Sequence, residues 1–461
     1  MEIAKRFLDE GKPADAFERL KKILREENFS DEWKLHELIG ACFHDLADAE
    51  GAAQAYLNAA KADKILRSQR EHFSNYLFAL HYLPQVDEKI LFDSAQIYNS
   101  LYRDAEILPQ KNFLNKKIHV AYIAPHFLDS SSARFYESLL TEFDSEKFFV
   151  TAWSLSSRED NFTKKIRLSV NQYFDISEIS FEEAAQKIFD NGADILFDLG
   201  GHSDGGMTLQ IAAYRPAKVQ ICGIGYFDTT GTNFIDYFLT DNFLIGGNEN
   251  FFSEKIFAVE NAFAFKPNEK MIHAKKNLQR TPHKNFVFGC LNNFMKISDD
   301  YLNCVKKILE QVPQSKIIFR DTTPLESRKI ELTKKIAEKK IPAERTEIFC
   351  GEDNFFNDYA EIDLILDTFP YTGGMMTALA LYFGVPVLNL CGKMHHSRLG
   401  AEMIRLAELN DFIVRDSEKY IAKAVEIFKS PRKNFSVDKL LDTKKFVESV
   451  ENFLSNLWIK A

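Results

Sequence analysis

The stretch DTFPYTGGMMTALALYFGVPVLNL, residues 367 to 390, predicts the end of a strand, a glycine turn, a short helix and a second strand. Gly373 and Gly374 allow close backbone approach and φ above zero, and residues 375–383 have a helical composition. A glycine turn that opens a helix leaves N–H groups and the positive end of the helix dipole facing outward, which favours a phosphate. Two glycines taken alone would also suit an ordinary turn between a strand and a helix.

The composition is typical of a globular protein with about two to four domains. The chain has 461 residues, of which 45% are hydrophobic and 27% charged. A net charge of −9 argues against a nucleic-acid partner, because such proteins normally present a basic face. The six cysteines form no CxxC pair, which argues against zinc and redox motifs. The first residues carry no apolar signal core and no run of about 18 apolar residues occurs, so we expect no membrane span and a cytoplasmic location.

Residues 1–108 are predicted to form an all-helical domain, since apolar residues recur there at helical spacing. The segment from Gly11 to Phe17 resembles the turn between the two helices of a tetratricopeptide-type repeat, and residues 40–60 resemble a second copy. Ala16 and Ala55 lie 39 positions apart in the sequence. Such repeats have a period of about 34 residues, so an insertion near residues 46–50 is required. A plain helical bundle without a partner is the alternative interpretation.

Apolar strands alternate with helical segments after the helical region, which predicts two parallel sheets with helices on both faces. We expect two Rossmann-like domains, at residues 109–270 and 271–461, with ligands beyond the carboxyl ends of the strands and a cleft between the halves as the active site. The expected strands lie at residues 118–124, 149–153, 194–197, 219–222, 236–239, 286–288, 316–319, 346–349, 363–366, 385–390 and 411–414.

Polar clusters follow several of these strands. The first is DLGGHSDGG at residues 198–206, followed by YRPAKVQ at 214–220 and GYFDTTG at 225–231. The second is GCLNNFMKI at residues 289–297, and the third is the glycine turn together with CGKMHHSR at 391–398. Each cluster places polar groups just past an apolar strand.

At these residues the chain resembles the O-GlcNAc transferase/SPINDLY family, glycosyltransferase family 41, in its bacterial form with a short repeat-like N-terminus. The ordered motifs DLGGH, RPA, TTG, DY and NNFMKI carry the resemblance, which extends from about residue 77 to the C-terminus. This chain has one extra glycine before His202. The resemblance implies a GT-B fold, in which two Rossmann-like domains here follow an all-α segment. It also implies inverting transfer from a nucleotide sugar, usually to a protein acceptor.

The resemblance also assigns residues to the donor. Lys296 would pair with the donor diphosphate and stabilise the departing negative charge more strongly in the transition state. A solvated surface lysine is the alternative. Asn293 stands where the family has a polar group that reaches the phosphates, and Phe355 could stack on a pyrimidine or belong to the core. Leu379 replaces an acid that holds the ribose in many members. The expected phosphate-binding helix start comprises Gly373, Gly374, Met375, Met376 and Thr377.

On the acceptor side, His202 is the main candidate, because a histidine beside glycines at a strand end is expected to be exposed. It could orient the acceptor, take its proton or contact the donor phosphate. His126 with Asp129 forms a second candidate, so the catalytic base stays unassigned. The pair His395–His396 has no third ligand at a suitable spacing, and we expect no metal.

These observations lead to a metal-independent inverting glycosyltransferase that needs no cofactor beyond its donor. The expected donor is UDP-N-acetylglucosamine, followed by another UDP-hexose or a GDP-sugar. The expected acceptor is a polypeptide side chain, Ser or Thr, presented by the N-terminal helices. The alternatives are transfer to Asn, a glycan or a small molecule, and a non-catalytic scaffold.

Overall fold

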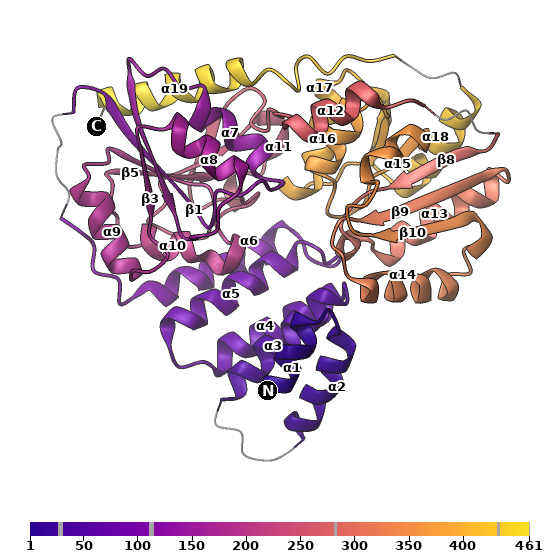
Figure 1. Ribbon diagram of the computed structural model, residues 1–461, viewed down its shortest axis with the longest axis horizontal. Coiled ribbons are helices and arrows are strands. Elements are labelled where there is room, and N and C mark those ends of the chain that lie inside the picture. The colour runs from indigo at the N-terminus through magenta and orange to yellow at the C-terminus, as the bar shows by residue number, and fades with distance from the viewer. Residues whose placement is uncertain (26–30, 110–114, 281–283, 431–433, 461) are drawn as a thin grey trace. The chain divides into compact units, whose positions relative to one another are not determined.

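The computed structural model describes residues 1–25, 31–109, 115–280, 284–430 and 434–460 (Figure 1). The chain folds into two units, each assembled from three separate stretches of sequence. Unit 1 comprises Met1–Asp63, Ala79–Val86 and Pro267–Asp438. Unit 2 comprises Lys64–Phe78, Asp87–Lys266 and Lys439–Ala461.

Unit 2 contains a sheet of seven parallel strands, sheet A, in the order β3-β2-β1-β4-β5-β6-β7. Its interior strand β1 is buried along its whole length, as expected for a parallel sheet covered on both faces. The strands are β1 Ile118–Ala124, β2 Phe148–Ser154, β3 Gln172–Asp175, β4 Ile195–Asp198, β5 Val219–Gly223, β6 Tyr237–Thr240 and β7 Lys255–Ala258.

Unit 1 contains a second parallel sheet, sheet B, with six strands in the order β10-β9-β8-β11-β12-β13. Figure 1 shows each sheet lying among the helices that connect its strands, which confirms the predicted α/β class with two Rossmann-like sheets. The strands are β8 Phe286–Cys290, β9 Ser315–Asp321, β10 Thr346–Cys350, β11 Leu364–Leu366, β12 Val387–Leu390 and β13 Ile413–Val414.

The helices follow the expected alternation with the strands. The longer helices are α1 Glu2–Asp9, α2 Pro13–Leu24, α3 Glu32–Asp45, α4 Ala49–Ala62, α5 Leu66–Leu80, α6 Glu88–Asn99, α7 Ala133–Thr141, α8 Asn161–Ser169, α9 Phe181–Asp190, α10 Met207–Ala212, α12 Glu269–Asn277, α13 Asp299–Gln311, α14 Glu326–Glu338, α15 Phe355–Glu361, α16 Met375–Tyr382, α17 Leu399–Leu406, α18 Ser417–Lys429 and α19 Thr443–Lys460.

Each strand expected from the apolar pattern is present, and two further strands, β3 and β7, were not predicted. Both lie at the edges of sheet A. Neither is fully buried: the four residues of β3 are half-buried or exposed, and β7 begins and ends with an exposed residue. Their short sequences, QYFD and KIFA, lack the long continuous apolar run of a strand such as β1.

The N-terminal helices form two hairpins, α1–α2 and α3–α4, around a shared apolar core. The predicted helix–turn–helix at Gly11 is confirmed. Helix α2 begins at Pro13 and α4 at Ala49, 36 positions later, and Ala16 and Ala52 are both fully buried. Ala52 is therefore the counterpart of Ala16, and the expected insertion at residues 46–50 is wrong, because each hairpin turn contains three residues.

One change of unit, between Lys266 and Pro267, lies close to the boundary predicted at 270, but the units divide the two ends of the chain differently from the predicted domains. The chain changes unit between Asp63 and Lys64, so α6 and most of α5 belong with sheet A rather than with the first four helices. The C-terminal helix α19 also belongs with sheet A and not with the second half of the chain. Phe453 stacks on Phe257 with ring centroids 3.5 Å apart, and the backbone N–H of Asp144 donates to Glu451 at 2.6 Å. The C-terminal segment returns to sheet A, which buries the apolar face of α19.

Each sheet has one place where the strand order reverses. In sheet A this switch point lies between β1 and β4, and in sheet B between β8 and β11. Connections from neighbouring strands leave in opposite directions there, which opens a crevice beyond the carboxyl ends of the strands. The loop with Lys296 follows β8 and the glycine turn follows β11, so both lie at the switch point of sheet B.

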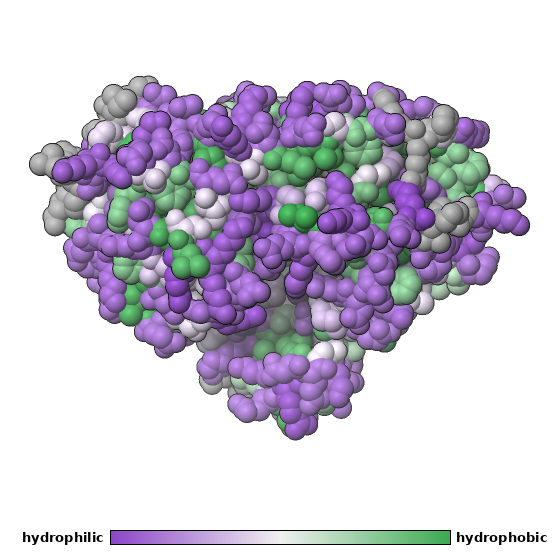
Figure 2. Space-filling view, turned by 45° about the horizontal axis from the view of Figure 1, so that its top comes forward, coloured by the Kyte–Doolittle hydropathy of each residue, from purple (hydrophilic) through white to green (hydrophobic). Residues whose placement is uncertain are grey.

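The face of the molecule in Figure 2 is mostly hydrophilic, with hydrophobic side chains in small separate groups. Within the described ranges, no helix combines the length and the apolar character needed to cross a membrane.

Candidate functional site

Lys296 ends a short 3-10 helix, Phe294–Lys296, that follows β8. Its Nζ donates a hydrogen bond of 2.8 Å to the carbonyl oxygen of Thr372 and lies 3.6 Å from the centroid of the Tyr371 ring. Burial lowers the pKa of Lys296 to about 8, against the opposing effect of the Asp367 carboxylate. The ammonium is therefore held against the glycine turn, in surroundings where an approaching anion would stabilise it.

Asp367 holds the loop between β11 and α16. Its carboxylate is fully buried and accepts hydrogen bonds from Asn292 Nδ2 at 3.0 Å, from the N–H of Gly373 at 2.7 Å and from Asn389 Nδ2 at 2.8 Å. Burial raises the pKa of Asp367, and these donors act in the opposite direction. The carboxylate thereby ties the ends of three neighbouring strands, β8, β11 and β12, to the turn that opens α16.

The glycine turn differs from its predicted conformation. Neither Gly373 nor Gly374 has a positive φ, and φ of Gly374 is −100°. The N–H of Gly373 is used by Asp367, and a Cβ at this position would lie 2.4 Å from Thr377 Oγ1. A Cβ at Gly374 would meet no atom within 4 Å. Gly373 is therefore required for internal packing, whereas Gly374 leaves open space.

Helix α16 begins at Met375, with Gly374 as its N-cap residue and without a capping side chain. Residues 374–376 are half-buried, while Thr377 is buried with its hydroxyl 3.4 Å from Asp367 Oδ2. The first N–H groups of a helix have no intrahelical acceptor, so this end of α16 can accept an anion. Leu379 is fully buried, and a ribose would need another polar partner.

Asn293 is anchored by its side-chain oxygen. Oδ1 accepts from the N–H of Met295 at 2.9 Å and from Nη1 of Arg328 at 3.0 Å. The same Nη1 lies 2.7 Å from Asp321 Oδ2, and both charged side chains are buried. Nη2 of Arg328 donates to the carbonyl oxygen of His44 at the end of α3. Only the Nδ2 group of Asn293 can therefore turn toward a ligand, and Arg328 connects the loop of Lys296 to the N-terminal helices.

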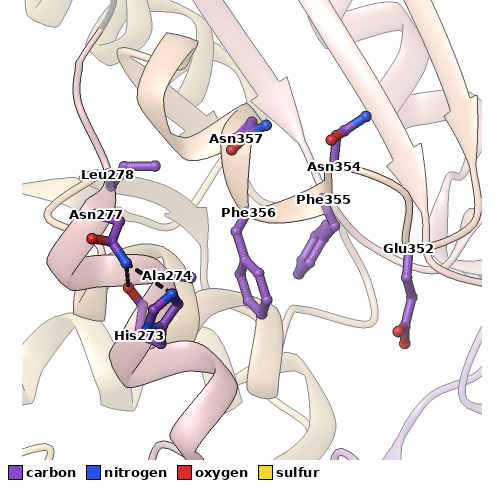
Figure 3. Close-up of a pocket in the computed structure, with 9 residues that line it drawn as sticks. All are labelled: His273, Ala274, Asn277, Leu278, Glu352, Asn354, Phe355, Phe356 and Asn357. Atoms are coloured by element: carbon purple, nitrogen blue, oxygen red, sulfur yellow. Dashed lines mark hydrogen bonds between the residues drawn. The ribbon is translucent and has the colours of Figure 1, made fainter.

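Phe355 and Phe356 line a pocket of about 240 Å³ between the start of α15 and α12 (Figure 3). Phe355 is mostly buried and contacts the Tyr359 ring, with centroids 5.5 Å apart, so it is both a core residue and part of a pocket wall. Figure 3 shows the two phenyl rings extending side by side to the same side of α15, while Asn277 of α12 is hydrogen-bonded to His273. The polar residues of the lining are His273, Asn277, Glu352, Asn354 and Asn357.

His202 is fully buried, and the expectation that its setting exposes it is wrong. Its Nδ1 lies 2.9 Å from Ser74 Oγ, and its Nε2 donates to the carbonyl oxygen of Thr230 at 2.9 Å. The rings of Tyr98 and Tyr226 pack edge-on against it at 4.6 and 5.1 Å. The glycines around His202 allow helices α5 and α6 to approach closely and to exclude solvent. A Cβ at Gly206, for example, would lie 2.3 Å from Ser74 Oγ.

The other sequence motifs of unit 2 also serve its folding. Glu254 is buried and accepts from the hydroxyl of Thr229 at 2.7 Å and the N–H of Thr230 at 2.8 Å, and burial raises its pKa. A Cβ at Gly231, where φ is +70°, would lie 2.2 Å from the carbonyl oxygen of Ala95 in α6. Arg215 pairs with Asp236 at 3.0 Å.

His126 follows β1 at the switch point of sheet A and is half-buried. Its Nδ1 accepts the N–H of Leu128 at 3.3 Å, which places the ring proton of neutral histidine on Nε2. Asp129 is not deeply buried, and its Oδ1 lies 3.2 Å from Nη2 of the buried Arg134. Its carboxylate therefore pairs with a structural arginine.

His395 and His396 are both buried. The His396 ring lies edge-on to His81 at 4.7 Å and to Tyr371 at 5.5 Å, and burial lowers the pKa of His396 well below its usual value. His396 is thus part of the packing behind Tyr371. Tyr371, Asp367 and Arg328 were not singled out from the sequence. The first two lie in the stretch 367–390, whereas Arg328 has no sequence signal, since its partners are distant in the chain.

Comparison with known proteins adds three findings. Residues 95–277 match the family model "Glycosyl transferase family 41". The chain is 24% identical over 439 residues to the tomato (Solanum lycopersicum) protein named "Probable UDP-N-acetylglucosamine--peptide N-acetylglucosaminyltransferase SPINDLY", which covers 86% of this chain and 45% of the relative. An Arabidopsis thaliana relative with the same name is 26% identical over 79% of this chain and 41% of its own length. The chain thus spans less than half the length of these curated relatives.

The solved structure of a mutant O-GlcNAc transferase from Thermobaculum terrenum superposes with a TM-score of 0.86 at 22% identity, over 98% of this chain and 88% of that chain. At this identity the match shows the fold, which agrees with the predicted GT-B architecture and its helical N-terminal segment. The chain is therefore similar to glycosyltransferase family 41 in residues 95–277, in the curated relatives that it matches and in its fold.

Proposed function

We propose that this chain is a glycosyltransferase that moves a sugar from a nucleoside diphosphate to an acceptor. The observation that carries the proposal is the arrangement at the switch point of sheet B, where the Lys296 ammonium lies against the turn that opens α16. Two independent positive features, a lysine and a helix N-terminus, meet beside open space at Gly374. This combination suits a diphosphate, which carries more charge than one helix end would hold.

In the proposed reaction, the acceptor oxygen forms a bond to the anomeric carbon of the sugar as the bond from that carbon to the diphosphate oxygen breaks. The electron pair stays on the diphosphate, and the acceptor proton passes to a base. Lys296 and the α16 N-terminus stabilise the charge that develops on the leaving group. Attack from the face opposite the diphosphate inverts the configuration. This charge stabilisation makes a metal ion unnecessary, and we propose that the reaction is metal-independent.

The proposed donor is UDP-N-acetylglucosamine, in line with the names of the relatives. Phe355 and Phe356 with the amide side chains of their pocket form a candidate base site, because a flat ring can stack on phenyl groups while amides read its edge. The proposed hydrogen-bond donors to the diphosphate are Nδ2 of Asn293 and the backbone N–H groups of residues 374–376. A different UDP-hexose or a GDP-sugar is the alternative donor.

The proposed acceptor is a Ser or Thr side chain of a polypeptide, with Asn, a glycan or a small molecule as alternatives. The catalytic base stays unassigned, because Nδ1 of His126 already accepts the backbone N–H of Leu128 and Nε2 carries the ring proton. The paired N-terminal hairpins are proposed to present the peptide. Glu50→Lys, on the exposed side of α4, should weaken transfer to protein without changing donor hydrolysis. Equal loss of both activities would show that the helices are structural.

A cytoplasmic location is proposed as well. All six cysteines are free, and most of them are buried. Free cysteines without disulfide bonds are typical of proteins in a reducing compartment.

The decisive experiment is hydrolysis and transfer with a panel of UDP- and GDP-sugars, followed by mass detection of the released nucleotide. We expect release from one UDP-sugar, retention of activity in excess EDTA, and loss of activity in Lys296→Met. Absence of release from every donor would favour a non-catalytic scaffold. Loss with EDTA that Mg²⁺ or Mn²⁺ restores would favour a metal-assisted enzyme.

A further inference from the structure

The Lys296 ammonium has two neighbours that come from consecutive residues of one loop. Nζ donates to the carbonyl oxygen of Thr372 at 2.8 Å, and the face of Tyr371 lies 3.6 Å away, measured to the ring centroid. A carbonyl oxygen attracts one N–H of the ammonium, and an aromatic face attracts the positive charge as a whole. A lysine has four rotatable bonds, so these two contacts decide where its charge stands.

The Tyr371 ring is itself held in place. Only 6% of Tyr371 is exposed, and its ring lies 5.1 Å from the Tyr82 ring and 5.5 Å from His396. The loop behind it is fixed, because Asp367 accepts the N–H of Thr368 at 2.9 Å as well as that of Gly373. The Tyr371 ring is therefore fixed, and the flexible Lys296 side chain takes its position from the ring.

The groups that act electrostatically on Lys296 come from three strands. Asp367, directly after β11, favours the charged ammonium and burial disfavours it, while the Cys290 thiol at the end of β8 is uncharged because burial raises its pKa to about 12. His396, which follows β12, interacts with the same charge. Asp367 is already engaged by several donors, so its carboxylate does not serve Lys296 alone. The ring is a contact that favours the ammonium without neutralising it.

We propose that Tyr371 is a positioning residue, whose ring holds the Lys296 ammonium against the turn that opens α16 and favours its protonated form. An aromatic face does this without forming an ion pair, so the full positive charge stays available to a diphosphate. A carboxylate in the same place would compete with the substrate for the lysine. The inference rests on the proposed function for its use in catalysis, but the effect on Lys296 can be measured without any activity.

The test compares Tyr371→Leu with Tyr371→Phe, since Phe keeps the ring and removes only the hydroxyl. The pKa of Lys296 is measured by NMR on protein carrying ¹³C-dimethylated lysines, with the Lys296 signal assigned by its absence in Lys296→Met. We expect Tyr371→Leu to lower this pKa by roughly one pH unit, the usual size of a partly buried cation–π contact. Tyr371→Phe should match the wild type. An unchanged pKa in Tyr371→Leu, or an equal shift in both variants, would overturn the proposal.

The matched control is Tyr382→Leu, which removes a ring of the same unit that faces Lys275 Nζ at 4.0 Å. It should leave the Lys296 signal unchanged. A shift equal to that of Tyr371→Leu would show a general loosening of the unit and would contradict a specific role.

A second measurement separates this inference from the proposed function. The affinity for UDP is followed by calorimetry from pH 6 to 9, and the decrease at high pH should begin roughly one unit lower in Tyr371→Leu than in the wild type or in Tyr371→Phe. A shifted lysine pKa with no UDP binding in any variant would leave the positioning role standing and refute the donor site. UDP binding that keeps the same pH dependence in all three proteins would refute the positioning role alone.

Discussion

The two switch points of this molecule have the same topology and different contents. His202 follows β4 at the reversal of sheet A, and Lys296 follows β8 at the reversal of sheet B. Both ring nitrogens of His202 are hydrogen-bonded by the protein, and helices α5 and α6 cover it. Lys296 makes one hydrogen bond and one ring contact, beside a glycine with open space around it. A polar motif at a switch point can therefore either stabilise the fold or bind a ligand. The difference lies in whether its polar atoms already have hydrogen-bond partners within the protein.

The chemistry of the two side chains explains the difference. A neutral histidine can be buried at little cost once both nitrogens have partners. A lysine keeps its charge only if something compensates for lost water, and the lowered pKa of Lys296 shows that compensation here is incomplete. A buried charged group that is stabilised only when a ligand binds is therefore a better indicator of a binding site than a polar group whose hydrogen bonds are all made within the protein.

The largest expected effect comes from Lys296→Met. Removing the ammonium should lower kcat by about 10²–10³, or about 3–4 kcal/mol of transition-state stabilisation. Methionine fills a similar volume, and the loss of an incompletely compensated charge should leave the melting temperature unchanged or raise it. Steady-state kinetics and thermal unfolding check both parts. Turnover near that of the wild type in a folded variant would remove Lys296 from the site.

His202→Ala should show the opposite pattern. Loss of the ring and of two buried hydrogen bonds should lower the free energy of unfolding by about 2–3 kcal/mol. The kcat of the protein that remains folded should change by less than about threefold, because the ring is fully buried and both of its nitrogens are hydrogen-bonded within the protein. Denaturant unfolding and kinetics normalised to folded enzyme measure the two effects. A hundredfold loss of kcat at unchanged stability would instead make His202 a catalytic group.

The adjacent glycines of the turn give a third, smaller contrast. Gly374→Ala places a methyl group in open space, where a phosphate would approach, and should reduce nucleotide affinity about tenfold without affecting stability. Gly373→Ala forces a Cβ against Thr377 Oγ1 and should cost about 1–3 kcal/mol of stability. Calorimetry and thermal unfolding of both variants provide the comparison. Unchanged affinity in Gly374→Ala would place the phosphates elsewhere.

The mildest test changes only the pH. Lys296 is charged below its pKa of about 8 and neutral above it, so kcat/KM should fall up to about tenfold per pH unit on the alkaline side. Lys296→Arg should lose this alkaline decrease, because a guanidinium stays protonated. Activity that rises steadily from pH 7 to 10 in the wild type would contradict a role for the charged lysine.

Much of the fold could be predicted because parallel strands covered on both faces are continuous apolar runs. The strand from Ile118 to Ala124 was predicted with its observed limits. The edge strands β3 and β7 were not, because their four-residue sequences contain no long continuous apolar run. Helix α19 was predicted to belong with residues 271–461, because it follows them in the sequence. The sequence of an amphipathic helix shows which face is apolar but not which sheet covers that face.

The sequence by itself determined the alternation of strands and helices, the family motifs and the presence of Lys296 and a glycine turn after buried strands. Local spacing encodes these features, because each depends on residues within one element or one turn. Only the tertiary structure decided that Ser74 and Thr230 occupy both nitrogens of His202, and that Tyr371 faces Lys296. Whether a polar atom is satisfied depends on partners many residues away in the chain, and chain folding alone brings such partners within hydrogen-bonding distance.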